Sequence, residues 1–154
     1  MGSHLTTFPR SSLMSLQITE SLVSHIINDL DTMIPRRPEW SIENGRYFID
    51  SIVENSEGLN LRFYGTKNEI RDPIPRFSYL LDGLRIRGID WHLERRSVDG
   101  RRISGWHEHI FHDKYKDNHV VEIEPGFDHI PHENQIDYVL NRWGITYSQI
   151  TLGL

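Results

Sequence analysis

Four of the nine histidines in this 154-residue chain lie between Trp106 and His119, in the segment WHEHIFHDKYKDNH. Two of them, His107 and His109, are separated by one residue. Side chains two positions apart on a β-strand point to the same face, so a strand here would hold two imidazoles side by side. Imidazole exchanges protons and binds metals near neutral pH. The spacing therefore predicts a compact polar site around this pair.

Further polar side chains are expected to join the pair from neighbouring strands. In a strand over residues 84–92, a bulge at Gly88 would bring the polar residues before and after it onto one face. An earlier strand contributes another arginine. The residues expected around the two histidines are one carboxylate, one more histidine and three arginines: Asp90, His92, Arg62, Arg85 and Arg87.

Three chemistries suit this set. In metal-independent phosphodiester cleavage, one histidine takes a proton from a ribose 2′-hydroxyl, another protonates the leaving oxygen, and arginine stabilises the charged phosphorane. Alternatively, the His-x-His pair binds zinc, nickel or iron together with Asp90 or His92. In the third case there is no chemistry, and the histidines lie on a surface strand or contact a protein partner. The arginines disfavour a bound cation because like charges repel, so we expect no metal and no cofactor.

The hydrophobic pattern predicts the elements that would position these residues. An amphipathic helix is expected after Thr19, ending before Pro35, and a closing helix over residues 136–143. The dipeptide Asp82-Gly83 is the strongest hairpin signal in the chain. Alternating or β-rich segments predict about five strands, drawn from residues 46–53, 59–64, 77–81, 84–92, 103–112 and 119–124.

This order of elements favours an α+β protein. We expect an antiparallel sheet of about five strands, with the N-terminal and the C-terminal helix packed on one face. Residues 15–154 are interpreted as a single domain, and residues 1–14 as an expression tag or a disordered start.

Composition restricts the compartment and the partners. The chain has no cysteine, which excludes disulfides, thiolate metal sites and a cysteine nucleophile, and which fits a reducing compartment. No apolar run approaches the length of a transmembrane helix. We therefore expect a cytoplasmic protein that does not bind membranes. The formal net charge is −5, yet arginines cluster around the turn at Asp99-Gly100. This cluster is equally typical of a solvated hairpin tip: Arg95, Arg96, Arg101 and Arg102.

Residues 84–144 resemble the toxins of TumE-type bacterial toxin–antitoxin systems. The resemblance lies in Arg87 and Asp90 on one strand, Gly105, His107 and His109 on the next, and the closing helix. Here Arg87 and Asp90 are separated by two residues, where the family pattern has one. The resemblance implies a nucleic-acid target and a small antitoxin protein as partner.

The function predicted from these observations is that of a prokaryotic RNase-like toxin. In this reading His107 and His109 are the acid and the base. Arg85 and Arg87, with Arg62, bind the phosphate, Asp90 orients a histidine, and His92 is a reserve catalytic residue. Two alternatives remain open: a non-catalytic protein that binds RNA or a partner through the same face, and a metal-dependent His-x-His enzyme. The sequence predicts no oligomeric state.

Overall fold

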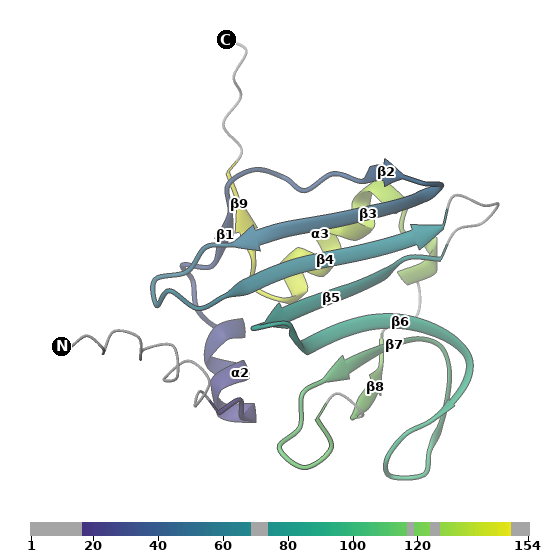
Figure 1. The fold of residues 1–154 in the computed structure, drawn as a ribbon. Helices are drawn as coiled ribbons and strands as arrows, with labels where there is room; N and C mark the ends of the chain where they lie inside the picture. The colour runs from purple at the N-terminus through teal and green to yellow at the C-terminus, as the bar shows by residue number, and fades with distance from the viewer. Residues whose placement is uncertain (1–16, 69–73, 117–118, 124–126, 149–154) are drawn as a thin grey trace.

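The computed structural model describes residues 17–68, 74–116, 119–123 and 127–148 (Figure 1). The interpretation of residues 1–14 as a tag or a disordered start lies outside this part of the chain. The helices are α2 (Glu20–Ile27) and α3 (His132–Arg142), with a short 3-10 helix η1 (Phe127–His129). The strands are β1 (Met33–Ile34), β2 (Ser41–Glu43), β3 (Arg46–Val53), β4 (Leu61–Asn68), β5 (Arg76–Leu81), β6 (Leu84–Arg96), β7 (Arg102–Ile110), β8 (Val120–Glu122) and β9 (Thr146–Tyr147).

Seven of these strands form one antiparallel sheet in the order β2-β3-β4-β5-β6-β7-β8, so each strand pairs with the next one along the chain. A separate parallel pair joins β1 to β9. The prediction of about five strands beneath two packed helices is therefore wrong. The described residues are mostly antiparallel sheet, and the two α-helices among them have only 8 and 11 residues.

The reason for this error is local. The edge strand β2 has three residues, which is too short for an alternating pattern to be recognised. The expected first helix is also shorter than its apolar pattern. It ends at Ile27, and the apolar residues Met33 and Ile34 form strand β1 instead. Tertiary pairing with β9 outweighs the helical periodicity there.

Two predicted local signals are confirmed. Thr19 caps α2, and its hydroxyl oxygen accepts a hydrogen bond from the Leu22 N–H at 3.1 Å. Asp82 and Gly83 form the turn between β5 and β6 with φ angles of 52° and 82°. This left-handed pair is the geometry that a two-residue hairpin requires.

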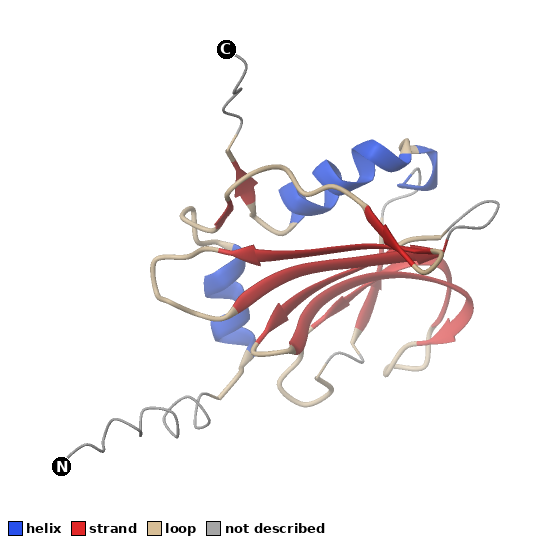
Figure 2. Cartoon of the chain, turned by 45° about the horizontal axis from the view of Figure 1, so that its top comes forward, coloured by secondary structure: helices blue, strands red, loops and turns tan. Residues whose placement is uncertain are grey.

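The core lies between the sheet and α3, which crosses one face of the sheet (Figure 2). Trp143, at the end of α3, is fully buried and stacks on Tyr79 of β5 with ring centroids 5.9 Å apart. Helix α2 lies at one end of the sheet and contributes Val23 and Ile26 to the same core. Within the described residues, neither helix is long and apolar enough to cross a membrane.

A bulge in β6 decides which side chains share a face. Leu80 of β5 is opposite Arg85, but Tyr79 is opposite Arg87, so Ile86 is the extra residue. Arg85 and Arg87 therefore point to opposite faces. The prediction that these arginines share a face is wrong, because the bulge lies at Ile86 and not at Gly88.

Candidate functional site

Asp90, His107 and His109 form a cluster, here called the triad, on the face of the sheet away from α3. Asp90 of β6 is directly opposite His107 of β7, and His109 is opposite Gly88. The two imidazole centroids are 5.0 Å apart, and His109 Nε2 lies 3.1 Å from Asp90 Oδ2. The prediction that the two histidines share a face, with Asp90 within reach on the neighbouring strand, is confirmed.

The triad is buried. The exposed fractions are 0 % for His107, 4 % for His109 and 3 % for Asp90. Figure 1 shows β6 as a strongly curved band beside β7, so this part of the sheet is not flat. Two buried histidines and a buried carboxylate need hydrogen-bond partners, because unpaired polar groups in a protein interior are costly.

Two arginines hold the Asp90 carboxylate. Arg85 Nη2 donates to Oδ2 at 2.9 Å, and Arg76 Nε donates to Oδ1 at 3.1 Å. Burial by itself would raise the pKa of this carboxyl. The hydrogen bond with His109 and the positive charges of Arg85 and Arg76 outweigh burial and hold the pKa of Asp90 well below its usual range. Asp90 is therefore a permanent negative charge at the centre of the cluster.

Gly88 makes room for one of these arginines. A Cβ atom at this position would lie 1.9 Å from both Nε and Nη2 of Arg85. The guanidinium of Arg85 thus crosses the backbone at Gly88 to reach Asp90, and only a residue without a side chain permits this path. The glycine that was expected to mark a bulge instead opens a route for Arg85 across the strand.

Arg87 belongs to a second cluster on the opposite face. Its Nη1 lies 3.3 Å from the buried carboxylate of Glu108, which also accepts from Arg142 Nε at 2.8 Å and from Trp143 Nε1 at 2.7 Å. These bonds tie β7 to the end of α3. Arg87 therefore does not lie beside the two histidines, and the expectation that it binds a phosphate there is corrected.

The remaining predicted site residues are Arg62, whose side chain is described, and His92, of which only the backbone is described. Arg62 of β4 is opposite Leu80, so it shares a face with Arg85, but β5 lies between them. Arg62 forms its ion pair with Asp50 at 2.8 Å. The backbone of His92 is paired opposite Gly105 in the ladder, whereas the side chain of His92 lies outside the described part of the chain.

Arg76 is the residue that sequence reasoning missed. In a regular hairpin from the turn at Asp82-Gly83, Arg76 would lie opposite Ile89, and Asp90 would point to the other face of the sheet. The bulge shifts the register by one residue, so that Phe77 is opposite Ile89 and Arg76 reaches Asp90. Arg76 and Ser78, two positions apart in β5, were a weak signal for a polar face.

The triad also has the composition of a metal site. Each of its members offers one ligand atom, and these atoms lie within 4.8 Å of one another. His107 Nδ1 lies 3.2 Å from the Gly105 carbonyl oxygen. A backbone carbonyl on one imidazole nitrogen is the usual way to orient the other nitrogen toward a metal or a substrate. The geometry alone thus allows either a metal ion or a substrate to bind at the triad.

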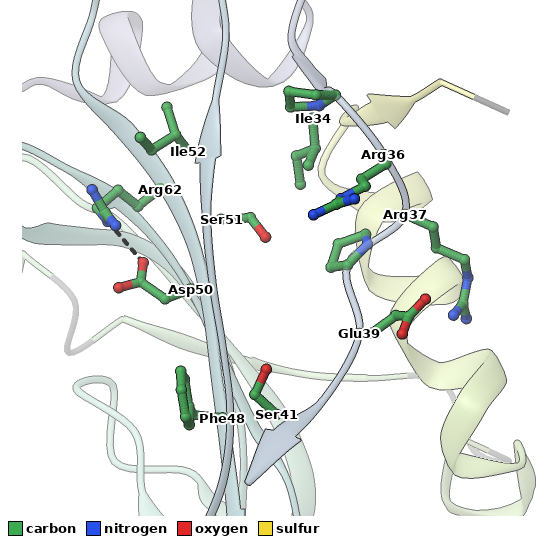
Figure 3. A pocket seen from close by; sticks show the side chains of 12 residues that line it. Ile34, Arg36, Arg37, Glu39, Ser41, Phe48, Asp50, Ser51, Ile52 and Arg62 are labelled. Carbon is green, nitrogen blue, oxygen red and sulfur yellow. Dashed lines mark hydrogen bonds and ion pairs between the residues drawn. The ribbon is translucent and has the colours of Figure 1, made fainter. Parts of the chain in front are cut away.

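A separate cavity of about 930 Å³ lies between residues 34–41 and strand β3. Figure 3 shows Arg36 and Ser51 in it, with the Arg62–Asp50 ion pair across β3. Among the three triad residues, none lines this cavity. This cavity and the triad are therefore different places.

Comparisons with protein-family models, curated proteins and solved structures gave no match to this chain. The resemblance to TumE-type toxins therefore stays a prediction.

Proposed function

We propose that this protein is an RNase-like toxin that cleaves RNA phosphodiesters by metal-independent acid–base catalysis at the triad. The observation that carries the proposal is the Asp90 carboxylate, which contacts His109 at 3.1 Å and Arg85 at 2.9 Å beside a second imidazole. Two proton carriers, an orienting carboxylate and adjacent guanidinium groups are the parts that such a reaction requires.

The charge around the triad favours an anionic ligand. With neutral histidines, Asp90 and the two arginines that contact it carry a formal charge of +1. One phosphodiester would bring this charge to zero, whereas a divalent cation would raise it to +3. Electrostatic interactions are strong in a site with little solvent, so this difference favours phosphate over metal.

The reaction can be written with the residues of this chain. One of His107 and His109 removes the proton of a ribose 2′-hydroxyl, and the oxygen attacks the neighbouring phosphorus. The other histidine protonates the departing 5′-oxygen, which leaves a 2′,3′-cyclic phosphate and a 5′-hydroxyl end. Asp90 orients His109 through Nε2. Arg85 and Arg76, which flank that carboxylate, stabilise the developing charge on the phosphate oxygens.

The test is cleavage of a labelled RNA by purified, untagged protein. His107→Ala and His109→Ala should each lower the rate by about 10²–10⁴-fold, the usual loss for one proton carrier. The matched control is His129→Ala, an exposed histidine far from the triad in sequence. Cleavage should leave cyclic phosphate ends and persist in EDTA. Cleavage that continues in the double variant, with the same end groups, would contradict the proposal.

A metal-dependent enzyme at the same triad is the second candidate, because the three ligand atoms lie within 4.8 Å of one another. Elemental analysis of untagged protein separates the two. A metal-dependent enzyme should carry one equivalent of zinc, nickel or iron, which His107→Ala should lose, and chelation should lower its melting temperature. A metal-independent enzyme should carry no bound metal, and chelation should not change its melting temperature.

The toxin assignment adds a cytoplasmic location and an antitoxin partner to the proposal. It depends on the resemblance of residues 84–144 to TumE-type toxins. Expression of the chain should arrest bacterial growth, and His109→Ala should abolish the arrest. A small protein encoded beside this gene should restore growth and bind the chain. Clean partner binding without cleavage of any RNA would favour the non-catalytic alternative.

A further inference from the structure

One edge of the sheet is open along the middle of β3. Strand β2 pairs with β3 only as far as Phe48. Further along, the Glu54 N–H donates to the Met33 carbonyl at 2.7 Å, and the Met33 N–H donates to the Glu54 carbonyl at 2.9 Å. The backbone groups of every second residue in a strand point to the same side. The N–H and C=O groups of Asp50 and Ile52 therefore point to the same side as those of Glu54, and within the described part of the chain no strand lies there.

The sequence explains why this edge is left open. Between their contacts with β3, Met33 and Ser41 are eight residue steps apart, whereas the residues of β3 that they contact are only six steps apart. The connecting segment, residues 35–40, must therefore bow away from β3. It contains Pro35 and Pro38, which have no N–H to donate to a neighbouring strand. The cavity of about 930 Å³ lies between this segment and the open edge.

The open edge favours a peptide as the ligand. Donors and acceptors alternate along it, and a polypeptide backbone carries complementary groups at the same spacing, so an extended peptide can add a strand to such an edge. Apolar side chains flank the edge. Ile52 is 60 % exposed, and Ile34 and Phe48 line the cavity beside it. The opening therefore offers main-chain hydrogen bonds together with apolar contacts.

The opening is short and closed at both ends. The pair of Met33 with Glu54 closes one end, and the pair of Ser41 with Phe48 closes the other. The distance between them corresponds to about 20 Å of strand. A continuous strand would have to leave the sheet at both ends of the opening, whereas the end of a chain has to leave at only one. The occupant that fits best is therefore a chain end, which brings a terminal charge with it.

The charge of Arg36 favours one end of a chain over the other. Figure 3 shows its side chain directed from the loop toward β3, and the Ser51 hydroxyl directed from β3 toward the loop. Among the described residues Arg36 forms no ion pair, whereas Arg37 contacts Asp137 at 3.2 Å. Glu39 is directed away from β3 (Figure 3). The cation that faces the open edge thus lacks a counterion, and guanidinium forms its strongest hydrogen bonds with carboxylate and phosphate.

We propose that this opening binds the carboxyl-terminal end of a partner polypeptide. The last residues of the partner add a short strand to β3 at Asp50 and Ile52. The terminal carboxylate binds the Arg36 guanidinium and the Ser51 hydroxyl, and apolar side chains of the tail contact Ile34 and Ile52. An amino-terminal end would bring a positive charge toward Arg36, which like-charge repulsion disfavours. This site is separate from the triad, and the proposal does not depend on the proposed function.

The test begins with short random peptides displayed with a free carboxyl terminus and selected on the immobilised full chain. An enriched peptide is synthesised with a fluorescent label at its amino end, and its Kd is measured by anisotropy. Amidation of its carboxyl end should weaken binding about ten- to hundredfold, the usual contribution of a hydrogen bond to a charged group. Arg36→Ala should cause a similar loss. The matched control is Arg46→Ala, an exposed arginine at the start of β3 outside the cavity, which should bind like the wild type.

The backbone contacts have a separate test. Ile52→Pro removes an N–H that points away from β4, so the ladder between β3 and β4 should persist and the variant should fold, as circular dichroism would show. Its affinity for the peptide should fall at least tenfold. Methylation of the peptide nitrogens, one at a time, tests the same contacts without altering the protein. It should abolish binding at alternate positions only, because successive N–H groups of a strand point to opposite sides.

Several results would overturn the proposal: no enriched peptide, equal affinity of the amidated peptide, or tolerance of methyl groups at every nitrogen. Equal affinity for the same peptide extended by glycines after its last residue would also overturn it, since an internal segment would then fit as well as a chain end. RNA cleavage by Arg36→Ala should equal that of the wild type. The binding result and the proposed function can therefore fail independently of each other.

Discussion

Gly88→Ala should displace the Arg85 guanidinium from Asp90 without distorting the strand. The new Cβ atom would lie 1.9 Å from Nε and Nη2 of Arg85, so these atoms must move. They belong to the end of a flexible side chain, which can turn away more easily than the backbone can shift. Gly88 has none of the positive φ angles found at other glycines, so alanine fits its backbone. The expected consequence is loss of the Arg85–Asp90 contact at 2.9 Å.

The magnitude follows from two opposing effects. A hydrogen bond to a charged group contributes about 1.5–3 kcal/mol to stability. Replacement of glycine by alanine at a compatible position stabilises by about 0.4–1 kcal/mol, because the unfolded chain loses conformational freedom. Gly88→Ala should therefore lower the free energy of unfolding by roughly 0.5–2.5 kcal/mol. Urea unfolding followed by circular dichroism measures this difference.

A double-mutant cycle with Arg85→Ala tests the cause. Without the guanidinium there is nothing for the new methyl group to displace, so in this background Gly88→Ala should stabilise by about 0.4–1 kcal/mol. The sign of the effect should reverse between the two backgrounds. Equal destabilisation by Gly88→Ala in the wild-type and Arg85→Ala backgrounds would refute the claim that Gly88 makes room for the Arg85 side chain. On the proposed function, the two single variants and the double variant should all lose about 10²-fold in RNA cleavage, because each one removes Arg85 from Asp90.

The other predictions concern the two buried carboxylates. Asp90→Asn should cost about 3–5 kcal/mol in urea unfolding, because it leaves two arginines without their carboxylate. The folded-state pKa of Asp90 lies below the unfolded value of about 4, so its stabilising effect is complete above that pH and is lost as the pH falls through the folded-state pKa. Unfolding midpoints from pH 6 to pH 2 should therefore fall more steeply for the wild type than for Asp90→Asn, and parallel curves would contradict the depressed pKa. Glu108→Gln should lower the melting temperature by weakening the bonds to Arg142 and Arg87, yet it should leave the cleavage rate of the folded protein unchanged, since Glu108 faces α3. Loss of cleavage by a folded Glu108→Gln protein would contradict the separation of the two faces.

The features that local sequence determined are those that depend on backbone geometry alone. His107 and His109 share a face because side chains alternate along any extended strand. The turn at Asp82-Gly83 forms because these residue types accept positive φ angles. The cap at Thr19 needs only a hydroxyl oxygen and the N–H groups of the next turn. Each of these relations spans four residues or fewer, so each is visible in the sequence.

Tertiary structure alone decided which arginines reach the site. The bulge at Ile86 turned Arg87 toward Glu108 and brought Arg76 to Asp90, and no periodic pattern marks its position. A one-residue shift moves every later side chain to the other face of a sheet, so a small error in placing the bulge exchanges a site residue for a core residue. The bulge is fixed by packing, since Ile86 is fully buried in a core that includes residues from α2 and α3. The burial of the triad has the same origin, because the curvature of paired strands depends on contacts between segments far apart in the sequence.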